Sequence, residues 1–177
     1  MTENEKKNAP EEVVEEKQPS PKQPTLDTYV KGIKEKVGED AITSAYINEV
    51  NSHRPTLIVD KNKWLEVAAL LKSEEGFKFD YLMNLSGVDY EKYMEVAYFL
   101  YSYTRDEYLT VKVQTERDGG SVPTVMNIWK TADWHEREAY DLLGIDFTGR
   151  KISRILLADD WVGFPLRKDY VPYDEGV

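Results

Sequence analysis

The sequence predicts an α+β domain: a mostly antiparallel sheet with helices packed on one face, followed by an extended C-terminal arm. Apolar residues recur at the helical period in two segments, whereas later segments are rich in β-branched and aromatic residues. Helix, strands, helix and further strands follow one another along the 177 residues. This order is typical of a single α+β domain.

The chain divides into three parts. Residues 1–24 are dominated by Glu, Lys, Gln and Pro, a composition that cannot bury enough apolar surface to offset chain entropy, so we expect a disordered tail. Residues 25–148 form the predicted domain. Residues 149–177 show little regular pattern beyond residues 152–157 and form the predicted arm.

The first half of the domain is expected to hold two helices and two strands. The first helix ends at Gly38, a natural C-cap residue, and its apolar stripe consists of Leu26, Tyr29, Val30, Ile33 and Val37. Strands are predicted over residues 42–50 and 55–59, with a polar turn between them. The second helix, residues 63–75, carries on one face Trp64, Val67, Ala68 and Leu71.

The second half begins with strands over residues 80–88, 93–101 and 109–114, the last two as an antiparallel pair. A loop is expected at residues 118–120, and residues 125–129 are expected to form a short helical turn.

A densely charged helix follows, from Asp133 to Gly144. Asp133 is a candidate N-cap, Glu136 stands three residues later as in a capping box, and Gly144 can close the helix. Arg137 precedes Asp141 by four residues, so these two side chains are expected to pair on one helix face.

Composition excludes several kinds of function. The net charge of −10 makes the chain a poor partner for nucleic acid, which requires clusters of Lys and Arg. Cysteine is absent, so the chain has no disulfides, thiolate nucleophiles or thiolate ligands for zinc or iron–sulfur clusters. We also find no apolar run long enough to span a membrane and no secretory signal.

The acidic residues near the C-terminus could in principle supply an acid/base pair. The candidates are Glu136, Glu138, Asp141, Asp159 and Asp160. However, Arg137, Arg154 and Arg167 lie in the same region, and a guanidinium beside a carboxylate keeps it ionised and makes it a poor general acid. Such pairs favour a structural network, and the chemistry alone favours a scaffold or interface over a catalyst.

His135 stands on the apolar stripe of the charged helix and is expected to be a core or interface histidine. A metal-binding role would need further ligands, and His53 is the only other histidine.

These residues resemble a known signature. The run from Glu136 to Ile145, together with Phe147, Gly149, Arg154 to Leu157, Asp160-Trp161, Gly163 and Pro165 to Tyr170, is similar to that of the thirty-kilodalton subunit family of respiratory complex I. This family is also known as the C subunit of the NADH–quinone oxidoreductase, and as the J subunit in plastids and cyanobacteria. It usually has histidine or lysine where this chain has Arg150, which keeps the basic charge but offers no neutral imidazole.

The resemblance implies a scaffold subunit in the peripheral arm of a proton-translocating NADH–quinone oxidoreductase, without a redox cofactor of its own. NADH, FMN, iron–sulfur clusters and quinone would belong to partner subunits. The chain would lie on the cytoplasmic side of the cell membrane, docked on the quinone-site subunit of complex I, beside the iron–sulfur subunits.

The resemblance also implies roles for individual residues. The ion-pair network would comprise Glu136, Arg137, Glu138, Asp141 and Arg154. The interface would comprise Asp160, Trp161, Phe164, Arg167 and Tyr170, which include the aromatic and arginine residues that anchor interfaces. Ordinary core packing is the alternative for Trp161 and Tyr170.

Two other functions stay open at this point. A membrane-bound hydrogenase, or a quinone oxidoreductase fed by another donor, would use a homologous subunit. An independent hydrolase would use Glu138 and Asp160 as its carboxylates.

Overall fold

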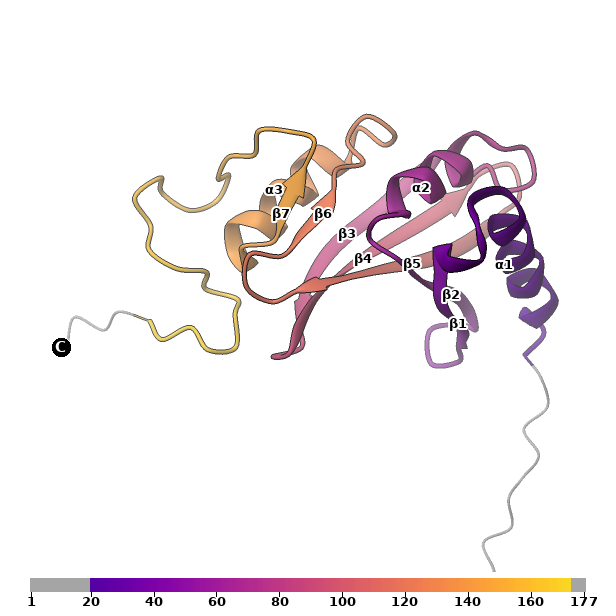
Figure 1. The fold of residues 1–177 in the computed structure, drawn as a ribbon, viewed down its shortest axis with the longest axis horizontal. Coiled ribbons are helices and arrows are strands. Elements are labelled where there is room, and N and C mark those ends of the chain that lie inside the picture. The colour runs from indigo at the N-terminus through magenta and orange to yellow at the C-terminus, as the bar shows by residue number, and fades with distance from the viewer. Residues whose placement is uncertain (1–19, 173–177) are drawn as a thin grey trace, which may run out of the picture.

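The computed structural model describes residues 20–172, so most of the predicted tail of residues 1–24 lies outside the described chain. Its last two residues, Gln23 and Pro24, belong instead to the first helix. The centre of the structure is a five-stranded sheet with the strand order β1-β2-β5-β4-β3 (Figure 1). The strands are β1 (Ile42–Asn48), β2 (Arg54–Val59), β3 (Tyr81–Asp89), β4 (Tyr93–Ser102) and β5 (Glu107–Glu116). Neighbouring strands are antiparallel except β2 and β5, which confirms the mostly antiparallel sheet.

Three helices cover one face of this sheet: α1 (Gln23–Val37), α2 (Trp64–Ser73) and α3 (Ala132–Leu143). A short 3₁₀ helix, η1 (Glu39–Ala41), links α1 to β1. The ring of Trp64 at the start of α2 lies 4.4 Å from that of Tyr98 on β4 and 6.4 Å from that of Trp129. Since Trp129 precedes α3, the helices share one apolar core, as predicted.

The packing of α3 depends on Gly87 in β3. A Cβ atom there would lie 2.5 Å from the Leu143 side chain and 2.9 Å from that of Ile145. The absence of a side chain therefore lets α3 approach the sheet closely. This contact brings the charged helix to the sheet edge formed by β3.

A second, two-stranded parallel sheet lies beside α3 and was not predicted from the sequence. It pairs β6 (Ser121–Pro123) with β7 (Asp146–Thr148). Each strand has three residues, too few for a periodic pattern to be recognised. The predicted turn at residues 125–129 is confirmed: the N–H groups of Ile128 and Trp129 both donate to the Val125 carbonyl.

Beyond β7, the described part of the arm contains neither helix nor strand, in agreement with the predicted extended segment. It leaves the domain beside α3, loops outward and returns to the sheet (Figure 1). The Leu166 N–H donates to the Leu142 carbonyl at the end of α3 (3.0 Å), and the Lys168 N–H donates to Asp89 at the end of β3 (3.0 Å). The arm therefore follows a course fixed by its contacts with the domain.

Candidate functional site

The charged helix α3 and the arm together form the candidate site. Gly144 ends α3 in a left-handed conformation with φ of 72°, and its N–H donates to the Tyr140 carbonyl, which confirms the predicted C-terminal closure. At the other end the prediction was wrong. The helix begins at Ala132, its N-cap residue is Thr131, and no side chain caps it.

Asp141 fixes the start of the arm. Its side chain is buried, and its Oδ2 accepts hydrogen bonds from the backbone N–H groups of Ile155, Leu156 and Leu157 at 2.7–3.0 Å. The Arg154 guanidinium donates to Oδ1 at 2.7 Å. Burial alone would raise the pKa of this carboxyl, but the backbone donors and Arg154 lower it to about 2. The carboxylate is thus ionised at neutral pH and holds four consecutive arm residues.

The predicted pairing of Arg137 with Asp141 was wrong. Arg137 donates instead to the backbone carbonyls of Ser153 (3.3 Å) and Arg154 (2.8 Å), and its guanidinium lies 5.3 Å from the Trp134 ring. The four-residue spacing places both side chains near one another, but the fully buried Asp141 faces the arm backbone rather than the helix surface.

Glu136 is buried in the core and forms no capping box. Its carboxylate accepts hydrogen bonds from the Thr124 hydroxyl (2.6 Å), the Val125 N–H (2.8 Å) and the Arg150 guanidinium (3.2 Å). Burial raises the pKa of Glu136, and these three donors partly offset that effect. Arg150 also pairs with Asp133, so it joins the first turn of α3 to the start of the arm.

Phe164 and Arg167 of the arm contact the end of α3. Arg167 Nε donates to the Leu143 carbonyl at 2.7 Å, and Arg167 Nη1 lies 3.2 Å from Asp118. The half-buried Phe164 ring lies between two guanidinium groups, 4.7 Å from that of Arg167 and 5.8 Å from that of Arg154. Both residues, expected at a partner interface, therefore also hold the arm on its own domain.

We expect Gly144→Ala to lower the free energy of unfolding by about 2–4 kcal/mol. A Cβ atom at Gly144 would lie 2.6 Å from the Phe164 ring and 2.8 Å from Arg167, adding overpacking to the left-handed backbone strain. Gly119→Ala is the matched control: its φ is 67°, but nothing lies within 4 Å. Chemical unfolding of both variants measures the difference. Equal losses would mean that Phe164 and Arg167 do not pack against Gly144 as described.

A second ion-pair group, formed around Arg117, binds the part of the arm near Asp169 to the domain. Arg117, which follows β5, donates two hydrogen bonds to Asp89 and pairs with Asp169 of the arm at 2.6 Å. The Arg117 guanidinium holds the pKa of Asp89 well below its usual range. This group was not found from the sequence because its members are separated by 28 and 52 residues, and no local pattern connects them.

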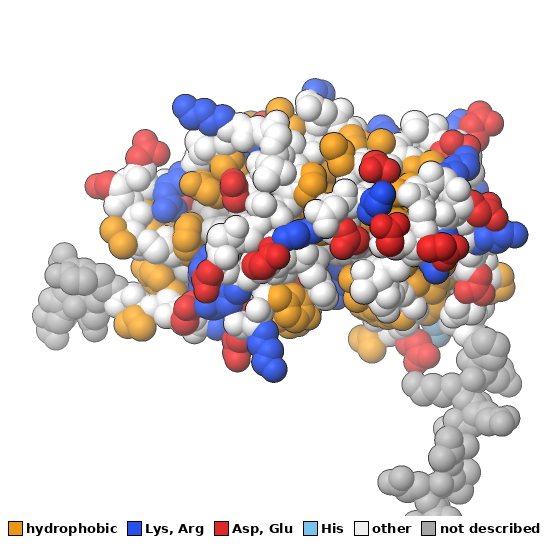
Figure 2. Space-filling model, in the orientation of Figure 1, with side chains coloured by type: hydrophobic (Ala, Val, Ile, Leu, Met, Phe, Trp, Pro, Cys, Tyr) orange, Lys and Arg blue, Asp and Glu red, His pale blue; other side chains and the backbone are white. Residues whose placement is uncertain are grey.

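Several arm residues lie at the surface. Asp160 and Trp161 are exposed and Tyr170 is half-buried, and they line a hollow of about 1340 Å³ together with Val162, Pro165, Val171 and Pro172. Trp161 is 42% exposed, so it is not a core residue. Leu156, Val162, Leu166 and Val171 are also exposed, and Figure 2 shows apolar side chains among charged ones at the end of the molecule where the arm lies. Apolar surface of this extent on one segment is typical of a protein interface.

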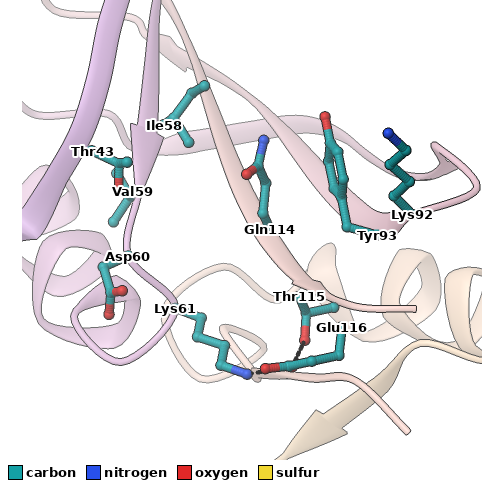
Figure 3. Close-up of a pocket in the computed structure, with 10 residues that line it drawn as sticks. All are labelled: Thr43, Ile58, Val59, Asp60, Lys61, Lys92, Tyr93, Gln114, Thr115 and Glu116. Atoms are coloured by element: carbon teal, nitrogen blue, oxygen red, sulfur yellow. Dashed lines mark hydrogen bonds and ion pairs between the residues drawn. The ribbon is translucent and has the colours of Figure 1, made fainter. Parts of the chain in front are cut away.

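The two carboxylates of the hydrolase hypothesis are not brought together in the described part of the chain. Glu138 lines a small hollow between α3 and β3 with His135, whereas Asp160 lines the hollow of the arm, so the two carboxylates of the hydrolase hypothesis do not share a site. A further hollow of about 400 Å³ lies at the edge of the open sheet face, where Lys61 pairs with Glu116 (Figure 3).

No group of three or more His, Asp or Glu among residues 20–172 could hold a metal ion. None of the helices in this part of the chain is long and apolar enough to cross a membrane.

The sheet, its single layer of helices and the buried arginine–carboxylate pairs define a class: an α+β domain that carries a C-terminal arm of fixed course. The chain belongs to the family described as the respiratory-chain NADH dehydrogenase 30 Kd subunit, whose model matches residues 57–175. The resemblance seen in the sequence is thereby confirmed.

Similar proteins agree with this assignment. The chain is 42% identical to the C subunit of NADH-quinone oxidoreductase from Chlorobium phaeobacteroides, over 78% of this chain and 84% of that protein. It is 44% identical to the C subunit from Chloroherpeton thalassium, again over 78% of this chain but 58% of that protein. The C subunit from Mycolicibacterium gilvum is 38% identical, over 82% of this chain and 67% of that protein.

Two solved structures share the fold. One, from the membrane-bound sulfane sulfur reductase, an archaeal respiratory membrane complex, has a TM-score of 0.66 and 25% identity over 83% of this chain and 86% of that one. The other is a trypsin-resistant fragment of Nqo5. It has a TM-score of 0.58 and 24% identity, over 71% of this chain and 97% of that one.

Proposed function

We propose that this chain is a scaffold subunit of the peripheral arm of a proton-translocating NADH–quinone oxidoreductase. In this role it docks on the quinone-site subunit, beside the iron–sulfur subunits, and supports electron transfer from NADH to quinone without carrying the electrons. The observation that carries the proposal is the arm: buried ion pairs hold its backbone while several of its apolar side chains are exposed.

The arm is preorganised for docking. Asp141, Arg154 and Arg167 fix the backbone on α3, so little conformational entropy is lost when a partner binds. Trp161 and Tyr170 border a hollow large enough to accept side chains of a partner. Aromatic residues in such positions commonly dominate the binding energy of an interface.

The carboxylates of the site support a structural role. Glu136 and Asp141 each accept at least three hydrogen bonds and face an arginine, so neither is free to exchange protons with a substrate. The hydrolase alternative gains no such support. On this proposal NADH, FMN, the iron–sulfur clusters and quinone are bound by partner subunits, and the chain lies on the cytoplasmic side of the membrane.

We expect the purified chain to be colourless and inactive with NADH and a quinone. The reason is that it has no cysteine to ligate an iron–sulfur cluster. The absorbance spectrum and the NADH oxidation rate of the isolated protein measure this, while the assembled complex serves as the positive control. A stoichiometric flavin or iron–sulfur spectrum in the isolated chain would contradict the cofactor-free role.

A further inference from the structure

A row of one arginine and three tyrosines crosses the open face of the sheet. Tyr81 on β3 pairs in register with Tyr101 on β4, which pairs with Tyr108 on β5. The rings of Tyr101 and Tyr108 lie 4.7 Å apart, and Arg54 at the start of β2 lies 4.8 Å from the Tyr108 ring. Cross-strand neighbours on one face of a sheet lie close together, which brings these four side chains into one row.

The row is covered at one end and open at the other. Arg54 covers the Tyr108 end by a cation–π contact. At the other end Tyr103 lies 5.0 Å from the Tyr101 ring and 5.7 Å from the Tyr81 ring. Tyr103 is 65% exposed and Tyr81 is 39% exposed. We call Tyr81, Tyr101, Tyr103 and Tyr108 the tyrosine row.

Two carboxylates border the open end. Asp106 accepts a hydrogen bond from the Tyr101 hydroxyl (2.7 Å), and Asp80 accepts one from the Tyr103 N–H (3.2 Å). Two cations also lie near this end: Lys72 Nζ donates to the Asp80 carbonyl (2.6 Å), whereas Arg105 is paired with Glu107 and donates to the Gly76 carbonyl. Among the described residues, neither Asp80 nor Asp106 forms an ion pair. The open end thus combines exposed aromatic faces with negative charge.

We propose that the tyrosine row binds an arginine-bearing segment of a neighbouring protein subunit. A guanidinium stacks on aromatic faces and forms paired hydrogen bonds with a carboxylate, so Tyr103 and Asp80 or Asp106 offer it both kinds of contact. The Arg54–Tyr108 contact is an example of the guanidinium–ring part of this arrangement within the chain.

The tyrosine row lies far from the arm. The arm contacts Asp89 at the end of β3, whereas Tyr81 begins that strand, and its nine residues span about 30 Å. A partner at the tyrosine row therefore does not overlap the surface proposed for the quinone-site subunit. This inference rests on the proposed function only in requiring that the chain sits in a multi-subunit complex.

The test uses the full chain in its membrane complex, with Tyr103→p-benzoylphenylalanine as a photo-crosslinking probe. Leu65→p-benzoylphenylalanine is the control, because Leu65 lies on α2 and is 48% exposed. After irradiation, mass spectrometry identifies the crosslinked peptides. We expect the Tyr103 probe to join a partner segment that contains arginine, and the Leu65 probe not to join that segment.

The inference is overturned if the protein copurifies with its partners but the Tyr103 probe joins no partner. It is equally overturned if the probe joins a segment without arginine, or residues 1–19 of this chain. Failure of the proposed function looks different, because the unmodified protein would then not copurify with the complex at all.

Two double variants distinguish the contribution of the aromatic rings from that of side-chain size. We expect Tyr81→Leu/Tyr103→Leu to increase the fraction of this protein lost from the complex in a salt wash roughly threefold to tenfold, because the cation–π contacts are removed. Tyr81→Phe/Tyr103→Phe keeps the rings and should behave like the parent. Circular dichroism confirms that both variants are folded, and equal losses from both would overturn the inference.

Discussion

Arg154→Ala is expected to lower the free energy of unfolding by about 3–5 kcal/mol. The reason is that Asp141 is fully buried and Arg154 is its charged partner at 2.7 Å. Removing the guanidinium leaves a buried negative charge with backbone donors only. Arg154 also donates to the Trp161 carbonyl, so the variant should release the middle of the arm as well. Urea unfolding followed by circular dichroism measures the change.

Arg137→Ala is the matched control for this prediction. Arg137 lies in the same helix–arm contact, but it donates only to two neutral carbonyls. Losing such bonds costs about 1–2 kcal/mol. The structure thus separates two arginines that look alike in the sequence. If Arg137→Ala destabilised the chain as much as Arg154→Ala, the central role of Asp141 would be wrong. If Arg154→Ala assembled normally but abolished electron transfer, the network would be catalytic.

Truncation after Ala158 is expected to abolish binding to the partner while the domain stays folded. The deleted piece contains Trp161, Phe164, Arg167 and Tyr170, yet among residues 20–172 none beyond Phe147 belongs to the buried core. Interface anchors often contribute about 2 kcal/mol or more each, so losing several should weaken binding at least about a hundredfold. Circular dichroism of the truncated chain and its copurification with the quinone-site subunit measure the two outcomes separately.

A single substitution tests whether one arm side chain contributes to partner binding. Trp161→Ala removes one exposed aromatic side chain from the arm, and Leu65→Ala removes a similarly exposed apolar side chain from α2. Only the first is expected to weaken copurification. Normal binding by the truncated chain would refute docking through the arm. Global unfolding would mean that the contacts of Arg167 and Asp169 with the domain are essential for its stability.

The parts of the fold that follow local periodicity were predictable. The stripes of α1 and α2, the β-branched and aromatic residues of β4 and β5 and the closing glycine of α3 are each recognised from residues a few positions apart. The strands β6 and β7 were not predictable, because three residues carry no period.

The candidate site was only partly predictable, because its contacts are long-range. Glu136, Asp141 and Arg154 stand out in the sequence, but Glu136 was assigned to a cap and Asp141 was paired with Arg137. Both assignments used helix-surface rules, whereas both carboxylates are buried and face other segments. The Arg150–Glu136 pair spans 14 residues and the Arg117–Asp169 pair spans 52, and only the folded chain brings these residues together.

Purification of the tagged chain from its native membrane in mild detergent tests the proposed scaffold role most directly. We predict that the quinone-site subunit and the iron–sulfur subunits copurify with it in equal amounts, together with NADH–quinone reductase activity. Recovery of the chain alone would contradict this role. Recovery with the large subunit of a nickel hydrogenase, and without NADH-binding partners, would contradict it as well.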